Sequence, residues 1–455
     1  MRVDAMRRSP WLVLAVMPLL MAAIVGSLQA PGLVFGVGVA ALLACVGLAL
    51  LVRRFGAGAV WMIAIPLSIL AGEVGSVGAG GQSGKLLAAD AVVAVGVLVV
   101  LLRNGGVLEV PRAPFLGLVA AFSVWAALGL LTALDPLTAI AELKEWCVAG
   151  VAAAAAFAWA TDRARAKLLL GALVVTAAAI ACGMLVVTMT HPAGPVFAVM
   201  MKQVDLAWGR SNYLAGFLIL ALPLALGRAL SAGTRREAWG WGLLMALCGM
   251  GLALSASKGA MLALVVTALP VFAMGGRGMR RAALIVVLLL VALALVFTQG
   301  PLKQVMTYRL AESAVDYSMN ERVDLYRLAW ESFVSHPLLG LGLNNFSVAS
   351  HVLRGLDTVP HQLELGLLAE VGLPGTLLGL ALLVVPLVQA WRLWRRATCT
   401  ADQALYGGML AAWAGMLAHN QVESTLYGEQ FKLFIALLAA ALWAFGRARE
   451  SAASA

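Results

Sequence analysis

The sequence predicts an all-α fold, that of a polytopic integral membrane protein, and three observations support this prediction. Hydrophobic residues make up 62% of the 455-residue chain, and charged residues make up only 12%. The mean hydropathy is +0.94, well above what a water-soluble chain shows. Apolar stretches of membrane-spanning length also follow one another along the whole chain. A bilayer solvates this much apolar surface, whereas a soluble domain cannot bury it.

About 14 stretches have the length that a transmembrane helix needs, which is roughly 20 residues or somewhat less where helices pack together. An even number of crossings places both termini on the same side. The connections are short except for residues 300–370, which predict a long loop containing amphipathic helices. The expected spans lie near residues 10–27, 32–52, 57–73, 87–102, 113–133, 145–160, 168–190, 212–230, 239–255, 259–275, 282–299, 371–390, 404–419 and 431–446.

Arginine and lysine cluster in every second connection between these spans and at both termini. Clear examples are Arg53-Arg54, Arg235-Arg236 and Arg395-Arg396. Short cationic loops resist translocation, so this set predicts cytoplasmic termini and a periplasmic 300–370 loop in a bacterial inner membrane. The net charge of +10 follows from the same asymmetry. It therefore indicates contact with membrane lipids and no nucleic-acid partner, because no basic patch is interleaved with aromatic residues.

Part of the long loop has the pattern of an amphipathic helix, from Asn320 to Ser335. Asn320 is a suitable N-cap, and Pro337 marks the end of the helix. Two glycines, Gly340 and Gly342, predict a turn directly afterwards. The apolar face that the spacing predicts consists of Val323, Tyr326, Trp330 and Phe333.

The two arginines on this predicted helix differ in their surroundings. Arg327 has Asp324 three residues before it and Glu331 four after it, which predicts intrahelical ion pairs. Arg322 has no carboxylate at those offsets. A guanidinium offers a rigid bidentate fork to a phosphate or carboxylate, so Arg322 is a candidate anion ligand. A solvated surface charge, or a contact with a lipid headgroup, is the alternative interpretation.

Three more residues are candidates for a site on the periplasmic face. Lys258 and Arg210 each lie next to a predicted span. Each is a candidate phosphate ligand, and the alternative is an interfacial side chain that snorkels toward the lipid headgroups. His361 lies at the end of the long loop, where an imidazole, with an ordinary pKa of about 6.5, suits a general base; a polar cap is its alternative role. The 5 cysteines show no metal-ligand spacing. We therefore expect no metal and no cofactor.

Two blocks, "NERVDLYRLAWESFVSHPLLGLGLNNF" and "HQLELGLLAEVGLPG", resemble the signature region of the O-antigen ligase and polymerase superfamily. "SASKGAMLALV" and "WGRSNYLAGFLILALPLALG" are similar to two further segments of that family. The resemblance covers about residues 205–430. It divides the chain into N-terminal transmembrane helices (1–204), a core that includes the periplasmic loop (205–430), and a last transmembrane helix with a cytoplasmic tail (431–455).

The resemblance implies a metal-independent membrane glycosyltransferase. Such an enzyme moves a glycan from undecaprenyl diphosphate to an acceptor hydroxyl on the periplasmic face. The acceptor is lipid A core in a ligase, and another lipid-linked glycan in a polymerase of surface polysaccharide or exopolysaccharide. By the same resemblance, Arg322 and Lys258 occupy the two positions that bind the diphosphate, with Arg210 as the residue that takes over if Lys258 does not suffice, and His361 assists the acceptor. Lys258 stands where the family has arginine, so the bidentate fork is missing at that position.

A transporter or flippase of polysaccharide or lipid-linked glycan is the alternative function. It predicts ionisable residues near the middle of the membrane, broken spans and an internal repeat. Asp90 is the one carboxylate that the predicted spans place well inside a helix, apart from end positions such as Glu73. The second half of the chain does not repeat the first. The sequence therefore favours the transferase.

The predicted topology can be tested by labelling single cysteines in a cysteine-free variant. A cysteine at Thr358 should react with a membrane-impermeant thiol reagent in cells whose outer membrane alone is open, because residues 300–365 are predicted to lie outside. A cysteine at Gly233, beside the Arg235 cluster, should react only after the inner membrane is permeabilised. Labelling at Thr358 that also requires this permeabilisation would contradict the topology.

Overall fold

The computed structural model describes residues 52–56, 58–77, 84–103, 113–206, 209–284, 307, 312–354 and 359–454. The chain divides into two compact units, residues 1–63 and 64–455. The described residues of the first unit are helical at 52–55 and from Gly58 onwards. The second unit contains every candidate site residue.

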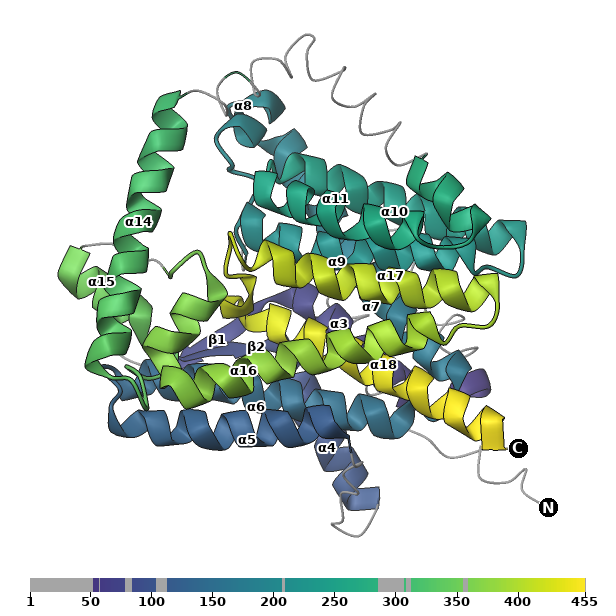
Figure 1. Ribbon diagram of the computed structural model, residues 1–455, viewed down its shortest axis with the longest axis horizontal. Helices are drawn as coiled ribbons and strands as arrows, with labels where there is room; N and C mark the ends of the chain where they lie inside the picture. The colour runs from purple at the N-terminus through teal and green to yellow at the C-terminus, as the bar shows by residue number, and fades with distance from the viewer. Residues whose placement is uncertain are drawn as a thin grey trace, which may run out of the picture. The chain divides into compact units, whose positions relative to one another are not determined.

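Helices make up most of the described chain, which agrees with the predicted fold class (Figure 1). The α-helices are α3 (Gly58–Ser68), α4 (Ala88–Arg103), α5 (Pro114–Leu128), α6 (Pro136–Trp159), α7 (Arg163–Thr190), α8 (Pro195–Met200), α9 (Ser211–Leu230), α10 (Arg235–Leu254), α11 (Lys258–Ala273), α14 (Glu312–Ser335), α15 (Asn345–Arg354), α16 (Leu363–Arg395), α17 (Thr400–His419) and α18 (Glu429–Ser454). Short 3-10 helices are η2 (Ile69–Ala71), η3 (Gly129–Leu131) and η4 (Thr425–Tyr427). The connection expected at 74–86 contains an antiparallel pair of strands, β1 (Glu73–Val77) and β2 (Gly84–Leu87), which pairs Ser76 with Lys85.

Six of the helical segments in the described part of the chain are long and apolar enough to cross a membrane. They are Pro114–Leu131, Arg163–Thr190, Ser211–Leu230, Arg235–Leu254, Leu363–Arg395 and Gln430–Glu450. Shorter apolar helices cover Gly58–Ala71, Ala88–Leu98 and Lys258–Ala273. The spans predicted at 10–27, 32–52 and 282–299 lie almost wholly outside the described residues. The other predicted spans overlap helices, so a polytopic all-α architecture is confirmed, although the count of about 14 crossings stays a prediction.

Several helices begin where the sequence offers a capping side chain. Asp135 accepts the Leu137 N–H over 3.1 Å at the start of α6, and Asp162 accepts the Arg165 N–H over 2.9 Å at the start of α7. α6 therefore starts at Pro136, well before the predicted span at 145–160. Starting there, it carries two buried acidic residues, Glu142 and Glu145. The expectation that Asp90 is the one carboxylate well inside a helix was therefore wrong.

The turn after α14 is hydrogen-bonded to α16 at a break in that helix. Gly372 has a left-handed backbone (φ 65°) inside α16, next to the predicted span boundary at 371. The break leaves the carbonyls of Ala369 and Glu370 free to accept the N–H groups of Leu341 and Gly342, each over 2.9 Å. Gly340 and Gly342 both have positive φ, which confirms the turn that the sequence predicts.

The helix predicted at Asn320–Ser335 is present but longer. α14 begins at Glu312, so Asn320 lies inside the helix and is not its N-cap. The end at Ser335, before Pro337, is confirmed. The predicted apolar face is wrong, because Val323 and Trp330 are about half exposed (49% and 53%). The face that packs on the bundle is instead formed by Leu325, Leu328, Ala329 and Ser332.

The bundle surrounds two strongly buried helices. α9 packs against α7, α10 and α17, and α18 packs against α6 and α7. α14 contacts α16 and α15 and runs crosswise to α16 and α17 (Figure 1). The beginnings of α9, α11 and α16, and the end of α17, therefore lie near one another at the end of the bundle where α14 docks. We call this the α14 end.

Candidate active site

The segment 359–363 and the connection 420–424 are hydrogen-bonded to each other, and this contact forms the centre of the candidate site. The Leu363 N–H donates to the Asn420 carbonyl over 3.1 Å. The Ser424 hydroxyl donates to the Pro360 carbonyl over 2.5 Å. These bonds join segments far apart in the sequence, and they fix the histidine of the first segment against the acidic residue of the second.

A single buried side chain, that of Asn420, holds the connection between α17 and α18 in shape. Its Nδ2 donates to the Met416 carbonyl over 2.9 Å and to the Thr425 hydroxyl over 3.0 Å. Its Oδ1 accepts the Leu426 N–H over 3.3 Å. Buried backbone groups at a helix end need such partners, because no water replaces them in an apolar interior. The turn thereby directs Glu423 toward segment 359–363.

His361 and Glu423 form the acid–base pair of the site. His361 Nδ1 lies 3.4 Å from Glu423 Oε1, and the other carboxylate oxygen accepts a hydrogen bond of 2.7 Å from Asn212 Nδ2 at the start of α9. The Glu423 side chain is buried, whereas the His361 side chain keeps 22% exposure. The imidazole thus has one nitrogen toward a fixed carboxylate while part of its side chain stays exposed.

The Glu423 carboxyl is held in its charged form by the bases around it. Burial raises its pKa, but the contact and charge of His361, together with the charges of His419 and Arg322, outweigh burial and keep the pKa below the ordinary 4.5. A buried, charged carboxylate beside an imidazole orients the ring and stabilises its protonated form. This pair therefore has the elements of a general base.

Arg322 reaches the pair from a separate element, α14. This helix docks through an apolar cluster formed by Leu325, Leu328, Ala329, Phe346 and Ala369. The half-buried Arg322 lies one turn before the cluster, and its charge acts on Glu423. The sequence offers Arg322 no carboxylate three or four residues away on its own helix, and the structure places Arg322 where its charge acts on Glu423 in the α17–α18 connection.

Arg327 has the role that its sequence neighbours predict. Its Nη1 lies 3.8 Å from Asp324 Oδ1, and both side chains are more than half exposed. This confirms the predicted pairing with Asp324. A pair of this kind supports the helix locally and lies outside the acid–base pair.

Lys258 and Arg210 lie at the same end of the bundle but in different positions. Lys258 is the exposed first residue of α11, and a Cβ on the next residue, Gly259, would lie 2.6 Å from the Val422 side chain. The first turn of α11 therefore touches the residue before Glu423. Arg210 precedes α9 near Asp205, whose pKa is raised by burial, against the Ser211 backbone hydrogen bond and the Arg210 charge, which lower it.

Sequence reasoning missed Glu423 and His419. Both belong to the run His419–Thr425, a polar stretch between two apolar helices, and that polarity was the available signal. Their connection was predicted only as a loop. Asn212 appeared in the sequence analysis as part of a resembling segment, without a role. The contacts of Glu423 with His361 and with Asn212 join positions 62 and 211 residues apart, and no local pattern encodes such pairs.

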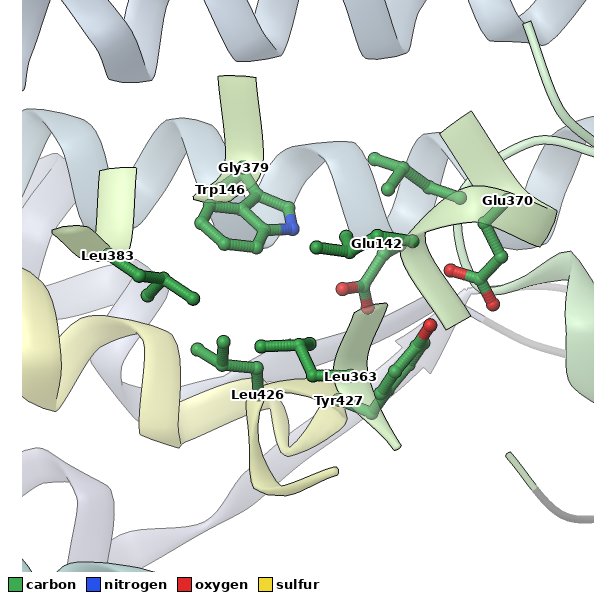
Figure 2. Close-up of a pocket in the computed structure, with 10 residues that line it drawn as sticks. Glu142, Trp146, Leu363, Glu370, Gly379, Leu383, Leu426 and Tyr427 are labelled. Atoms are coloured by element: carbon green, nitrogen blue, oxygen red, sulfur yellow. The ribbon is translucent and has the colours of Figure 1, made fainter. Parts of the chain in front are cut away.

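A small cavity of about 20 Å³ lies close to the site, lined by Leu363 and Tyr427 among others (Figure 2). Figure 2 shows the Glu142 and Glu370 carboxylates and the Tyr427 hydroxyl converging there. Room of this size suits one water molecule and excludes a sugar. Glu370 instead accepts the Phe346 N–H over 3.2 Å at the start of α15, which is a structural role.

Residues 243–380 match the family model described as O-antigen ligase. The matched segment contains Lys258, Arg322 and His361, and it ends before Glu423. It is narrower than the 205–430 range of the resemblance seen in the sequence. No curated protein matches the chain. The predicted recognition is thus confirmed, and residues 243–380 match the O-antigen ligase family.

Proposed function

We propose that this protein is a membrane glycosyltransferase of the O-antigen ligase and polymerase type. It would move a glycan from undecaprenyl diphosphate to an acceptor hydroxyl at the α14 end, which we propose faces the periplasm. The observation that carries the proposal is the contact of His361 with the charged Glu423, on which Arg322 also acts. Two of these three residues lie in the segment that matches the O-antigen ligase family.

The transfer step follows from the arrangement of the pair. With Nδ1 of His361 toward Glu423, Nε2 is the nitrogen left to accept the acceptor's hydroxyl proton. The acceptor oxygen forms a bond to C1 of the donor glycan as the bond from C1 to the phosphate oxygen breaks. The bonding electron pair leaves with undecaprenyl diphosphate, and the proton remains on His361. Glu423 stabilises the imidazolium that results.

The charge that grows on the diphosphate needs fixed cations. Arg322 suits this role because its guanidinium binds two phosphate oxygens at once. Lys258 and Arg210 are the further cations proposed for the diphosphate, and Lys258 offers charge without the bidentate geometry. Fixed cations at an apolar boundary stabilise such charge more strongly than water does.

The reaction as proposed needs no metal and no other cofactor. Within the residues described, no group of three or more His, Cys, Asp or Glu side chains is placed to hold a metal ion. The acceptor is either lipid A core or another lipid-linked glycan, and both fit a mechanism that needs only a hydroxyl.

A transporter or flippase is the second candidate function, and specific observations favour it. Lys144 lies 2.5 Å from Asp90, and the fully buried Lys432 lies 2.6 Å from Glu142. Ionisable residues inside a bundle, and a broken helix such as α16, are features of transporters. These charges pair with each other, however, and lie outside the acid–base pair.

A transfer assay in nanodiscs and a transport assay in vesicles together separate these functions. Purified protein in nanodiscs is given a lipid-linked glycan donor, with and without lipid A core. A ligase forms product only with lipid A core, and a polymerase lengthens the glycan without it, in either case releasing undecaprenyl diphosphate. We expect transfer to continue in EDTA. If donor crosses the bilayer of reconstituted vesicles while no transfer occurs, the transporter is correct; loss of transfer in EDTA, restored by a divalent ion, would overturn the metal-free mechanism.

The two arginines of α14 should respond differently to substitution. Arg322→Lys keeps the charge and loses the bidentate fork, so turnover should fall roughly tenfold to a hundredfold, the effect of losing a charge-assisted hydrogen bond. Arg327→Ala, the matched control, should keep turnover and lower stability by less than about 1 kcal/mol, since its ion pair is exposed. Turnover and thermal unfolding of both purified variants decide between the assignments. The opposite pattern would mean that the two roles are exchanged.

Removing the proposed base should abolish most of the transfer while the donor still binds. His361→Ala should lower turnover by about a hundred- to ten-thousandfold, the usual contribution of a general base. Glu423→Gln should lower it by at least about tenfold, because the imidazole loses the carboxylate that orients it. Full turnover in His361→Ala would remove the histidine from the mechanism.

The thermal stability of the unmodified protein and of Glu423→Gln, measured at several pH values, tests whether Glu423 is charged. The pKa of Glu423 is lowered in the folded protein, so its contribution to stability is present above about pH 4.5 and is lost as pH falls through the folded value. The difference in thermal unfolding midpoint between the unmodified protein and Glu423→Gln should persist from pH 7 to 5 and shrink below. A difference that disappears already between pH 7 and 6 would contradict the charged pair.

A further inference from the structure

The side-chain amide of Asn212, in the first turn of α9, lies between Glu423 and Lys202. Its Nδ2 donates to Glu423 Oε2 over 2.7 Å, and its Oδ1 accepts a hydrogen bond of 3.0 Å from Lys202 Nζ. Only this orientation of the amide serves both neighbours, because an ammonium only donates and a carboxylate only accepts. The bond from Lys202 therefore directs the donor end of the amide toward Glu423.

The start of α9, which carries Asn212, is held in place from two sides. Asp205 Oδ1 accepts the Ser211 N–H over 2.7 Å, which satisfies one of the free backbone donors at the helix start. One turn further along α9, a Cβ on Gly216 would lie 3.0 Å from the Thr425 side chain, so the helix packs closely on the α17–α18 connection. The amide of Asn212 therefore starts from a fixed backbone position.

Asn212 binds the carboxylate oxygen of Glu423 that does not face the histidine. Oε1 lies 3.4 Å from His361 Nδ1, and Oε2 accepts the hydrogen bond from the amide. The torsion that rotates a glutamate carboxylate has a broad energy minimum, so the side chain alone does not fix which oxygen faces which partner. A hydrogen bond to Oε2 restricts this rotation and keeps Oε1 toward the imidazole.

The amide of Asn212 is neutral, and this matters for a carboxylate that supports a base. The Glu423 side chain is buried, and the charges of His361, His419 and Arg322 already act on it. A buried carboxylate oxygen needs a hydrogen-bond donor. An amide supplies one without adding a further positive charge that would compete with the imidazolium for Glu423. Asn212 thus satisfies the oxygen and leaves the negative charge to the histidine.

We propose that Asn212 is a positioning residue for the transfer step and that it acts through Glu423. This inference rests on the proposed function, in which His361 accepts the proton of the acceptor hydroxyl. Asn212 holds Oε2 so that Oε1 faces the imidazole when the proton arrives, and Glu423 then stabilises the imidazolium. Substitution of Asn212 should therefore lower kcat and leave the KM for the donor unchanged.

Turnover of purified full-length variants in nanodiscs, with a lipid-linked glycan as donor, tests this role. Asn212→Asp keeps the size of the side chain and an acceptor for Lys202, but it offers Glu423 no N–H; Asn212→Leu removes both hydrogen bonds. Each should lower kcat roughly tenfold to a hundredfold, the effect of losing a hydrogen bond to a charged group, with the donor KM within about threefold of the unmodified value. In Glu423→Gln, the same substitutions should lower kcat by less than about a further threefold, because residues that act through one interaction are not additive.

Asp205→Ala is the matched control at the same helix start. It removes the acceptor of the Ser211 N–H and leaves the amide of Asn212 in place. It should lower the thermal unfolding midpoint, because a helix start loses its hydrogen-bond partner. Any change in kcat should be the same with Glu423 and in Glu423→Gln, since the two sites are then independent.

The outcomes separate this inference from the proposed function. Normal kcat in Asn212→Asp and Asn212→Leu overturns the role of Asn212, while transfer by the unmodified protein leaves the proposed function standing. A loss of kcat that is equally large in Glu423→Gln also overturns it, because Asn212 then acts on the fold and not through the carboxylate. A raised donor KM with unchanged kcat contradicts it as well, since Asn212 then serves donor binding. Should Asn212→Leu fold poorly, Asn212→Asp gives the decision. An unmodified protein that transfers no glycan refutes both proposals.

Discussion

The candidate site depends on the contact between segment 359–363 and the connection 420–424. Two hydrogen bonds across this contact and the buried Asn420 side chain fix the relative positions of His361 and Glu423. Other elements approach the pair from outside: α14 brings Arg322 near it, and Asn212 at the start of α9 donates a hydrogen bond to Glu423. Because polar groups in an apolar interior must be paired, this contact has few alternative arrangements. The geometry of the pair therefore rests on backbone and side-chain hydrogen bonds made by the neighbours of His361 and Glu423 within these two segments.

The sequence predicted features that local patterns encode. Apolar stretches located the helices, Pro337 marked the end of α14, and Gly340 and Gly342 marked the turn after it. The start of α14 was wrong because a favourable cap residue, here Asn320, is a weak local signal that the rest of the fold can override. Its buried face was wrong for a related reason: spacing shows that a face exists, whereas the neighbours at the docking surface decide which face is covered.

The site itself was only half visible in the sequence. Arg322 stood out because no carboxylate lies three or four residues from it on its own helix, and His361 because of its place at the end of the long loop. Glu423 did not stand out, because its significance lies in the partners that folding brings to it, Asn212 from one helix and His361 from another. A local pattern can show that a charge lacks a neighbour in sequence, but it cannot show which distant residue supplies one.

The order of the site residues along the chain has a consequence for biosynthesis. The candidate residues leave the ribosome in the order Asn212, Arg322, His361 and Glu423, and the last of them precedes α18. A nascent chain in which the residues after α17 have not yet been synthesised therefore contains the arginine and the histidine without Glu423, the carboxylate that contacts the histidine. Because α18 also fills the space between α6 and α7, the pair reaches its final geometry only when the last helix has entered the bundle. The candidate site therefore takes its described form only after α18 has been synthesised and has joined the bundle.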